Sequence, residues 1–204
     1  DLPVKVRGDL PEWLVPSFEA TFGDRAAEEG AALASRAPID LRVNTLQTDR
    51  ATMLEALSRF GAVAGPLSPL CVRIAAPGPE TRNANVEAEP AHGRGWYEVQ
   101  DAASQVAALL SGVAPGETVA DICAGAGGKT LALAALMQNR GKLVAHDTDR
   151  HRLRPIFERL TRAGAENVDV LAAQDGGRLS EKSFDCVLID APCSGSGAWQ
   201  RKPD

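Results

Sequence analysis

Apolar residues in the second half of the chain recur in the order expected for strands that alternate with helices. Four short apolar runs have the length of buried strands: 118–122, 142–146, 168–172 and 184–189. Helical spacing of apolar residues between the first three runs predicts helices over 131–138 and from about 149 to 163. Alternation of this kind implies right-handed crossovers and a parallel sheet with helices on both faces. The second half is therefore expected to be an α/β domain.

The first half of the chain shows shorter elements in a different order. Apolar and polar residues alternate over 39–43, which predicts a half-buried strand. The other elements expected here are two short helices, a longer helix and a second strand: 11–22, 24–36, about 49–60 and 70–74. This order predicts a small α/β module with helices in front of it.

Residues 75–95 contain Pro, Gly, Asn, Glu and Ala but few large apolar residues, which is typical of a loop or linker. We place the domain boundary after this stretch, so that residues 1–95 form the N-terminal module and residues 96–204 form the second domain. A short strand at 96–101 opens the second domain, and Asp101 is expected to cap the helix that follows.

Composition limits the classes of protein to which the chain can belong. With 204 residues, 44% of them hydrophobic, it can form two domains at most. Its four cysteines form no Cys-x-x-Cys pair, so neither a zinc site nor a disulfide framework is expected. The sequence has no charged leader and no apolar run of the roughly 18 residues needed to span a membrane. We therefore expect a cytoplasmic protein without a metal or a membrane partner, and we take it to be a monomer.

Each of the four strands expected after residue 117 ends at or near an acid: Asp121, Asp147, Asp175 and Asp190. Ligands of parallel α/β sheets bind at the carboxyl ends of the strands. The glycine-rich turn at 123–130 lets backbone amides approach a ligand closely, and an acid about 20 residues after such a turn can hold a ribose. The sequence therefore predicts a nucleoside-bearing cofactor at this edge of the sheet.

Residues of this turn discriminate between three cofactors. A Walker loop needs glycine five positions before Gly128, where Cys123 stands, so ATP hydrolysis is disfavoured. A dinucleotide fingerprint that starts at Gly125 needs Gly or Ala where Thr130 stands, which weakens the case for NAD. Acids around the pocket suit a cofactor with a positive sulfonium and an amino group. We therefore expect S-adenosylmethionine.

Three motifs follow one another along the chain: Val-Gln-Asp-Ala-Ala-Ser-Gln at 99–105, Cys-Ala-Gly-Ala-Gly-Gly-Lys-Thr at 123–130 and Asp-Ala-Pro-Cys-Ser-Gly-Ser-Gly at 190–197. Together they resemble the Sun/Nol/Nop family of RNA cytosine-C5 methyltransferases, most closely its type B methyltransferases of small-subunit ribosomal RNA. Leu-Arg-Val-Asn at 41–44 and Arg-Lys-Pro-Asp at 201–204 are similar to family patterns too. The resemblance implies a Rossmann-like class I methyltransferase sheet preceded by a small α/β RNA-binding module.

Roles for individual residues are implied by the same resemblance. The turn would wrap the methionine part of S-adenosylmethionine, and Asp147 and Asp175 would hold the ribose and adenine side. Independently of the resemblance, the position of Lys129 at the start of a helix that faces the site favours a role near the substrate. Asp190 would lie between cofactor and base and bond the cytosine at N3 and at its amino group. The implied cofactor-binding residues are Cys123, Ala124, Gly125, Ala126, Gly127, Gly128, Lys129, Asp147, Asp175 and Asp190.

Methylation of cytosine C5 needs a cysteine thiolate that adds to C6, because C5 alone is a poor nucleophile. From the residues alone Cys193 is the obvious nucleophile. The resemblance instead makes Cys193 the residue that helps to resolve the covalent intermediate, while a second cysteine in a Thr-Cys-Ser motif attacks; that motif does not occur in the sequence. We take Asp190, Cys193 and Lys129 as catalytic candidates.

A methyltransferase sheet of this type has about seven strands, and four are expected here. Within these 204 residues, the outer edge of the strand at 184–189 is expected to have no partner strand. We therefore expect the sequence to be part of a longer protein.

RNA contact is indicated less directly than the cofactor. The formal net charge of −5 gives no basic footprint, although a local patch can coexist with an acidic average. We expect Arg42 and Arg201 to contact phosphate or base of an RNA, ribosomal RNA by the resemblance. Two alternatives stay open: an NAD-dependent oxidoreductase, and a non-catalytic RNA-binding or assembly factor built on a methyltransferase scaffold.

Overall fold

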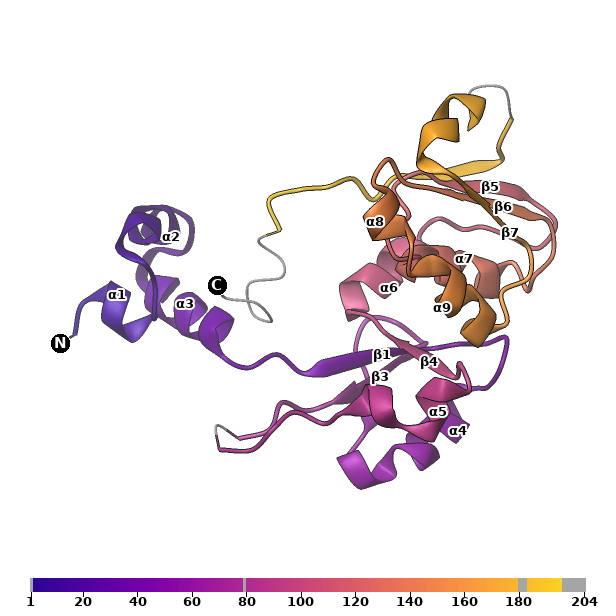
Figure 1. Ribbon diagram of the computed structural model, residues 1–204. Helices are drawn as coiled ribbons and strands as arrows, with labels where there is room; N and C mark the ends of the chain where they lie inside the picture. The colour runs from indigo at the N-terminus through magenta and orange to yellow at the C-terminus, as the bar shows by residue number, and fades with distance from the viewer. Residues whose placement is uncertain (1, 79, 180–182, 196–204) are drawn as a thin grey trace. The chain divides into compact units, whose positions relative to one another are not determined.

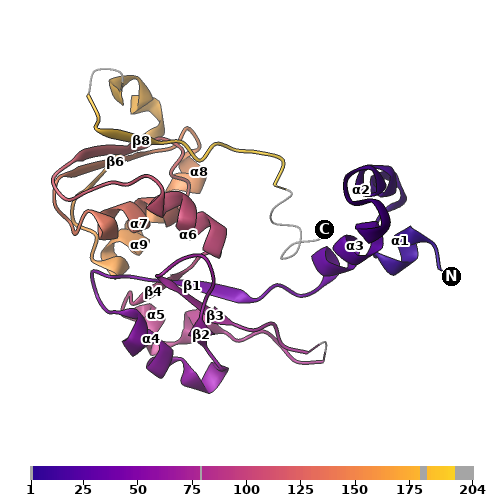
Figure 2. The same cartoon turned by 180° about the vertical axis from the view of Figure 1, so that it is seen from behind.

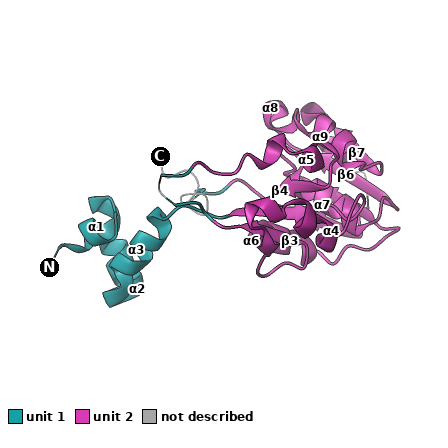
Figure 3. Cartoon of the chain, turned by 90° about the horizontal axis from the view of Figure 1, so that it is seen from below, with its two compact units in different colours: residues 1–38, 76–81, 193–204 teal, residues 39–75, 82–192 magenta. Residues whose placement is uncertain are grey.

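The structure of the chain, a computed structural model, describes residues 2–78, 80–179 and 183–195. It contains helices and two four-stranded sheets, one antiparallel and one parallel (Figure 1, Figure 2). Two compact units divide the chain (Figure 3). The first consists of residues 1–38, 76–81 and 193–204, and the second, which contains both sheets, of residues 39–75 and 82–192.

Short helices build the first unit. They are α1 (Val4–Arg7), α2 (Val15–Phe22) and α3 (Ala26–Ala34), with the 3-10 turns η1 (Glu12–Leu14) and η2 (Gly23–Arg25). These bounds agree with the helices expected over 11–22 and 24–36. Helix α3 packs closely against the end of α1, because a Cβ on Gly30 would lie 2.5 Å from the carbonyl oxygen of Gly8. Glycine is therefore required where these two segments meet.

The antiparallel sheet has the strand order β2-β3-β1-β4. Its strands are β1 (Ile39–Val43), β2 (Val63–Ala64), β3 (Cys71–Ile74) and β4 (Tyr97–Val99). The connecting segments contain α4 (Arg50–Ala56), η3 (Ser58–Phe60), η4 (Val86–Ala88) and α5 (Pro90–Gly93). Asp49 caps α4, since its carboxylate accepts the N–H of Thr52 at 2.9 Å. The largest buried side chains of this core are Leu41, Met53, Leu57 and Tyr97.

Two features of this sheet differ from the expectation. The strand expected to open the second domain is β4, which pairs instead with β1 and places Glu98 opposite Arg42. The strand predicted over 39–43 is confirmed as β1, but its predicted half-burial is wrong, because the polar positions are also buried, with Asp40 6% and Arg42 3% exposed. Burial follows because β3 and β4 flank β1 and helix α6 (Ala102–Leu109) packs against it.

The parallel sheet has the strand order β7-β6-β5-β8. Its strands are β5 (Thr118–Asp121), β6 (Lys142–His146), β7 (Val168–Leu171) and β8 (Cys186–Leu188), and every pairing is parallel, as predicted. The connections contain α7 (Gly128–Leu136), α8 (Arg150–Leu153), α9 (Ile156–Ala163) and η5 (Ala173–Leu179). Pro155 separates α8 from α9, where one helix is expected, because proline removes a helical hydrogen bond. Among the described strands, β8 pairs with β5 alone, which agrees with the free edge expected there.

Helices α6, α7 and α9 lie between the two sheets in both Figure 1 and Figure 2. They cover the face of the parallel sheet that is turned toward the antiparallel sheet. Leu133 of α7 and Met137, which follows this helix, are buried against Val119 and Leu143, and Ile156 of α9 is buried in a neighbouring cluster. This arrangement brings side chains of the antiparallel sheet close to the start of α7, where the glycine turn lies.

Candidate active site

The turn between β5 and α7 is shaped by glycine. Gly127 precedes the helix with φ +86°, a left-handed value that other residues rarely adopt. A Cβ on Gly127 would lie 2.5 Å from Cγ1 of Ile156, so a side chain has no room. The N–H of Gly127 donates to the carbonyl oxygen of Ala124, and the N–H of Ala124 donates to that of His146, both at 2.9 Å. The turn is therefore a fixed loop attached to the carboxyl ends of β5 and β6.

Two buried carboxylates hold this turn. Asp147, directly after β6, accepts the N–H of Gly125 at 2.9 Å and, through its other oxygen, that of Asp149 at 2.8 Å. Asp121, the last residue of β5, accepts the hydroxyl of Thr130 at 2.7 Å. Burial raises the pKa of Asp121 to about 6. Each oxygen of a carboxylate can accept more than one hydrogen bond, so Asp147 can also bind hydroxyl groups of a ribose.

Lys129 and Asp190, both expected in the active site, form an ion pair. The Nζ of Lys129 lies 2.5 Å from Oδ2 of Asp190. They meet because β8 pairs with β5 in parallel, which puts the residues that follow these strands at the same edge of the sheet. The Lys129 side chain is 14% exposed and that of Asp190 57%. The ion pair therefore orients Asp190 and leaves more than half of its side chain accessible to a ligand.

Asp175 lies in η5, which follows β7. Its neighbour Gly176 packs against the imidazole of His146, since a Cβ there would lie 2.7 Å from Nε2. His146 ends β6 and precedes Asp147. Asp175 and Asp147 are thus brought to the same end of adjacent strands, as the sequence predicts.

The remaining expected site residues are Cys193, Arg201 and Arg42. Cys193 has a free, exposed thiol and belongs to the other compact unit, and Arg201 lies outside the described residues. Arg42, which the sequence assigns to RNA contact at the surface, is buried, and its Nη1 donates to Gly128 O and Gln100 Oε1 at 2.6 Å each. Burial lowers the pKa of Arg42 to about 10. Arg42 therefore supports the glycine turn from the interior, which corrects the expected role.

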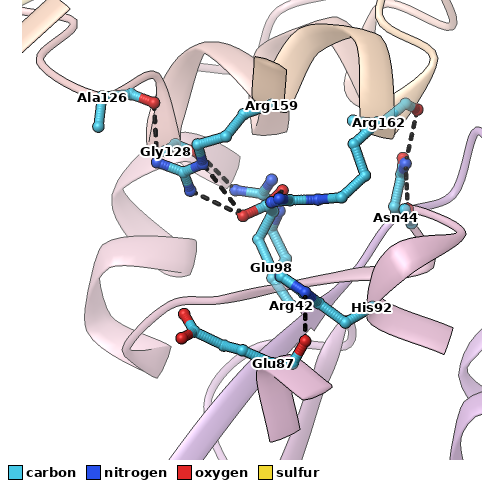
Figure 4. A network of polar contacts seen from close by, with 11 residues as sticks. Arg42, Asn44, Glu87, His92, Glu98, Ala126, Gly128, Arg159 and Arg162 are labelled. Atoms are coloured by element: carbon cyan, nitrogen blue, oxygen red, sulfur yellow. Dashed lines mark hydrogen bonds and ion pairs between the residues drawn. The ribbon is translucent and has the colours of Figure 1, made fainter. Parts of the chain in front are cut away.

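A cluster of charged residues that the sequence does not indicate lies beside Arg42 (Figure 4). Glu98 of β4 is buried and accepts from Nη2 of Arg159 at 2.8 Å and from Nη2 of Arg162 at 2.7 Å. Burial alone would raise the pKa of Glu98, but these guanidinium groups hold it below its ordinary value. Arg159 also donates from Nη1 to the carbonyl oxygen of Ala126 at 2.7 Å. No local pattern indicates this cluster, because β4 and α9 are more than 50 residues apart.

Besides the two arginines that hold its carbonyl groups, the glycine turn has acids, a lysine and backbone amides around it, and the acids fit a cofactor with positive and hydroxyl groups. Within residues 2–78, 80–179 and 183–195, His, Cys, Asp and Glu form no group of three that could hold a metal ion. Over the same residues, no helix has the length and apolar character required to cross a membrane.

Both halves of the chain match models of protein families. Residues 108–204 match the model described as 16S rRNA methyltransferase RsmB/F, and residues 10–81 match the ferredoxin-like domain of RsmF/B-like methyltransferases. A probable ribosomal RNA small subunit methyltransferase B from Synechocystis sp. is 31% identical over 199 residues, which cover 96% of this chain and 44% of that protein. The chain spans less than half the length of the curated relatives that it matches.

Solved structures are similar over nearly the whole chain. The crystal structure of PH0851 is 31% identical with a TM-score of 0.85, over 98% of this chain and 45% of that one. A methyltransferase homolog protein from Pyrococcus horikoshii is 30% identical with a TM-score of 0.77, over 95% of this chain and 63% of that one. The chain thus shares its fold with these two proteins.

Proposed function

The chain belongs to the RsmB/F family of 16S rRNA methyltransferases, and we propose that the protein methylates carbon 5 of a cytosine in RNA with S-adenosylmethionine as methyl donor. The observation that carries the proposal is the ion pair of Lys129 with Asp190 beside the glycine turn. The ion pair puts Asp190, which would bind the target base, next to the turn that would bind the cofactor. The names of the family and of the Synechocystis relative support small-subunit ribosomal RNA as substrate. A ribosomal substrate makes the cytoplasm the proposed location.

S-adenosylmethionine fits the residues around the turn. Backbone amides of residues 123–129 would hold its methionine part, and the carboxylates of Asp147 and Asp175 would accept hydrogen bonds from the ribose and adenine side. The negative charge of Asp190 near the turn suits a sulfonium. Bound there, the cofactor supplies an electrophilic methyl group.

Asp190 is the residue proposed to act on the base. C5 of cytosine becomes nucleophilic only after a thiolate adds at C6, and this addition increases electron density at N3. A carboxyl group in its acid form would donate a proton to N3 and accept a hydrogen bond from the amino group, which neutralises that charge. Lys129 would hold the resulting carboxylate of Asp190 in place. After the methyl group has joined C5, a base takes the proton from C5, the electron pair of that C–H bond forms the C5–C6 double bond, and the C6–S bond breaks, which returns the thiolate. We assign the assistance of this last step to Cys193.

Bisulfite sequencing of 16S rRNA tests the proposal. In a strain with the intact gene, a cytosine methylated by the protein resists conversion, and in a deletion strain the same cytosine is expected to convert. The wild-type gene should restore resistance, whereas an Asp190→Ala gene should not. A deletion that leaves every cytosine unchanged would contradict cytosine methylation and would favour a non-catalytic RNA-binding role.

A further inference from the structure

Two carbonyl groups of the glycine turn are held by arginines. Ala126 O accepts Nη1 of Arg159 at 2.7 Å, and Gly128 O accepts Nη1 of Arg42 at 2.6 Å, so both neighbours of Gly127 are fixed (Figure 4). A guanidinium group binds more strongly than a neutral donor. Two charged donors therefore hold the carbonyl groups of the turn that is proposed to bind the cofactor.

Both arginines are anchored by the antiparallel sheet. Arg42 stands on β1, and the residue opposite it on β4 is Glu98. Glu98 accepts from Nε of Arg159 at 3.2 Å and from its Nη2 at 2.8 Å, which is the two-pronged geometry that fixes a guanidinium plane. Gln100, after β4, accepts from Arg42 at 2.6 Å. Neighbouring strands of one sheet thus set the positions of both donors.

The direction of these contacts matters for a ligand. The described residues contain no cis peptide, and in a trans peptide the C=O and the following N–H point in opposite directions. With Gly128 O directed at Arg42, the N–H of Lys129 is directed away from the antiparallel sheet. The cluster also has three guanidinium groups, from Arg42, Arg159 and Arg162, beside the single carboxylate of Glu98. The positive excess behind the turn favours an anionic group in front of it, such as the carboxylate of a methionine moiety.

We propose that Arg42 and Arg159 are positioning residues through which the antiparallel sheet fixes the cofactor turn, with Gln100 as the anchor of Arg42 and Glu98 as the anchor of Arg159. The identity of the ligand rests on the proposed function, but the control of the turn by the sheet does not. The affinity of the turn for the cofactor then depends on residues of the antiparallel sheet that lie outside the methyltransferase motifs.

Arg42→Met in the full-length protein tests this role, and Arg73→Met is the matched control. Arg73 stands on β3 of the same sheet, where its two bonds to Asp40, at 2.6 and 2.8 Å, repeat the cross-strand pairing without touching the turn. For each variant we would measure the melting temperature, the Kd for S-adenosylhomocysteine by calorimetry, and hydrogen exchange of the amides of residues 124–131 without cofactor. Arg159→Lys, which keeps the charge but loses the planar fork, serves as a second variant in case Arg42→Met fails to fold.

For Arg42→Met we expect a Kd raised on the order of tenfold or more, together with faster exchange in the turn, because a buried charged hydrogen bond is lost. Arg73→Met should lower the melting temperature but leave Kd and exchange in the turn as in the wild type. Unchanged exchange in Arg42→Met and Arg159→Lys, or an equal effect of Arg73→Met, would overturn the inference. If exchange responds as expected but the wild-type protein does not bind S-adenosylhomocysteine, the positioning role stands and the proposed cofactor is wrong.

Discussion

Replacing Gly127 with alanine tests the geometry of the cofactor turn most locally. The residue has φ +86°, and holding alanine in the left-handed region costs about 1–2 kcal/mol. The new Cβ would also lie 2.5 Å from Cγ1 and 3.0 Å from Cδ1 of Ile156, an overlap that costs about 1–3 kcal/mol more when the core has to shift. We therefore expect Gly127→Ala to lower the free energy of unfolding by about 2–5 kcal/mol.

Urea unfolding measures this loss, and two comparisons separate its causes. Gly112 has φ +64° and no heavy atom within 4 Å of an added Cβ, so Gly112→Ala should cost only the backbone contribution of about 1–2 kcal/mol. Ile156→Ala removes the atoms that the new Cβ meets, so the double variant should lose about 1–3 kcal/mol less than the sum of the two single variants. Additive losses, or equal losses for Gly112→Ala and Gly127→Ala, would refute the close contact with Ile156.

Two further substitutions probe the acids and thiols of the site. Burial raises the pKa of Asp121 from 3.8 to about 6, so the folded state binds the proton more tightly and loses stability as the pH rises through this window. The free energy of unfolding of Asp121→Asn, measured in urea, should therefore rise relative to that of the wild type by on the order of 2–3 kcal/mol between pH 4 and pH 7. If the difference between the two free energies stays constant over this pH range, the raised pKa is contradicted. Cys193→Ser in the full-length protein should accumulate a covalent RNA adduct on a denaturing gel, because the assisting thiol is lost; complete absence of the adduct would make Cys193 the nucleophile.

Local patterns were sufficient for much of the parallel domain. Its strands are short apolar runs, so their periodicity predicts the strands to within two residues at either end. Asp101 caps α6 as expected, with its carboxylate accepting the N–H of Ala103 at 2.9 Å. The rule that ligands bind at the carboxyl ends of parallel strands also predicts the edge at which Lys129 and Asp190 meet.

Long-range pairing accounts for what the sequence could not predict. Nothing near Tyr97–Val99 indicates that this strand joins β1 rather than the second domain. Arg42 occupies a polar position in an alternating strand, a pattern that normally indicates exposure. Its burial depends on acceptors supplied by Gln100 and Gly128, which are 58 and 86 residues away. A buried arginine is stable only when such partners exist, and a single sequence does not reveal them.

Transfer of a labelled methyl group tests the central claim most directly. The full-length protein would be incubated with unmodified 16S rRNA and S-adenosylmethionine that carries a deuterated methyl group, and the nucleosides would be analysed by mass spectrometry. The proposed function predicts label in 5-methylcytidine with the wild-type protein and none with Asp190→Ala, whose fold should be retained because Asp190 is 57% exposed. Label on another nucleoside, or no label with the folded wild-type protein, would contradict cytosine-C5 methylation.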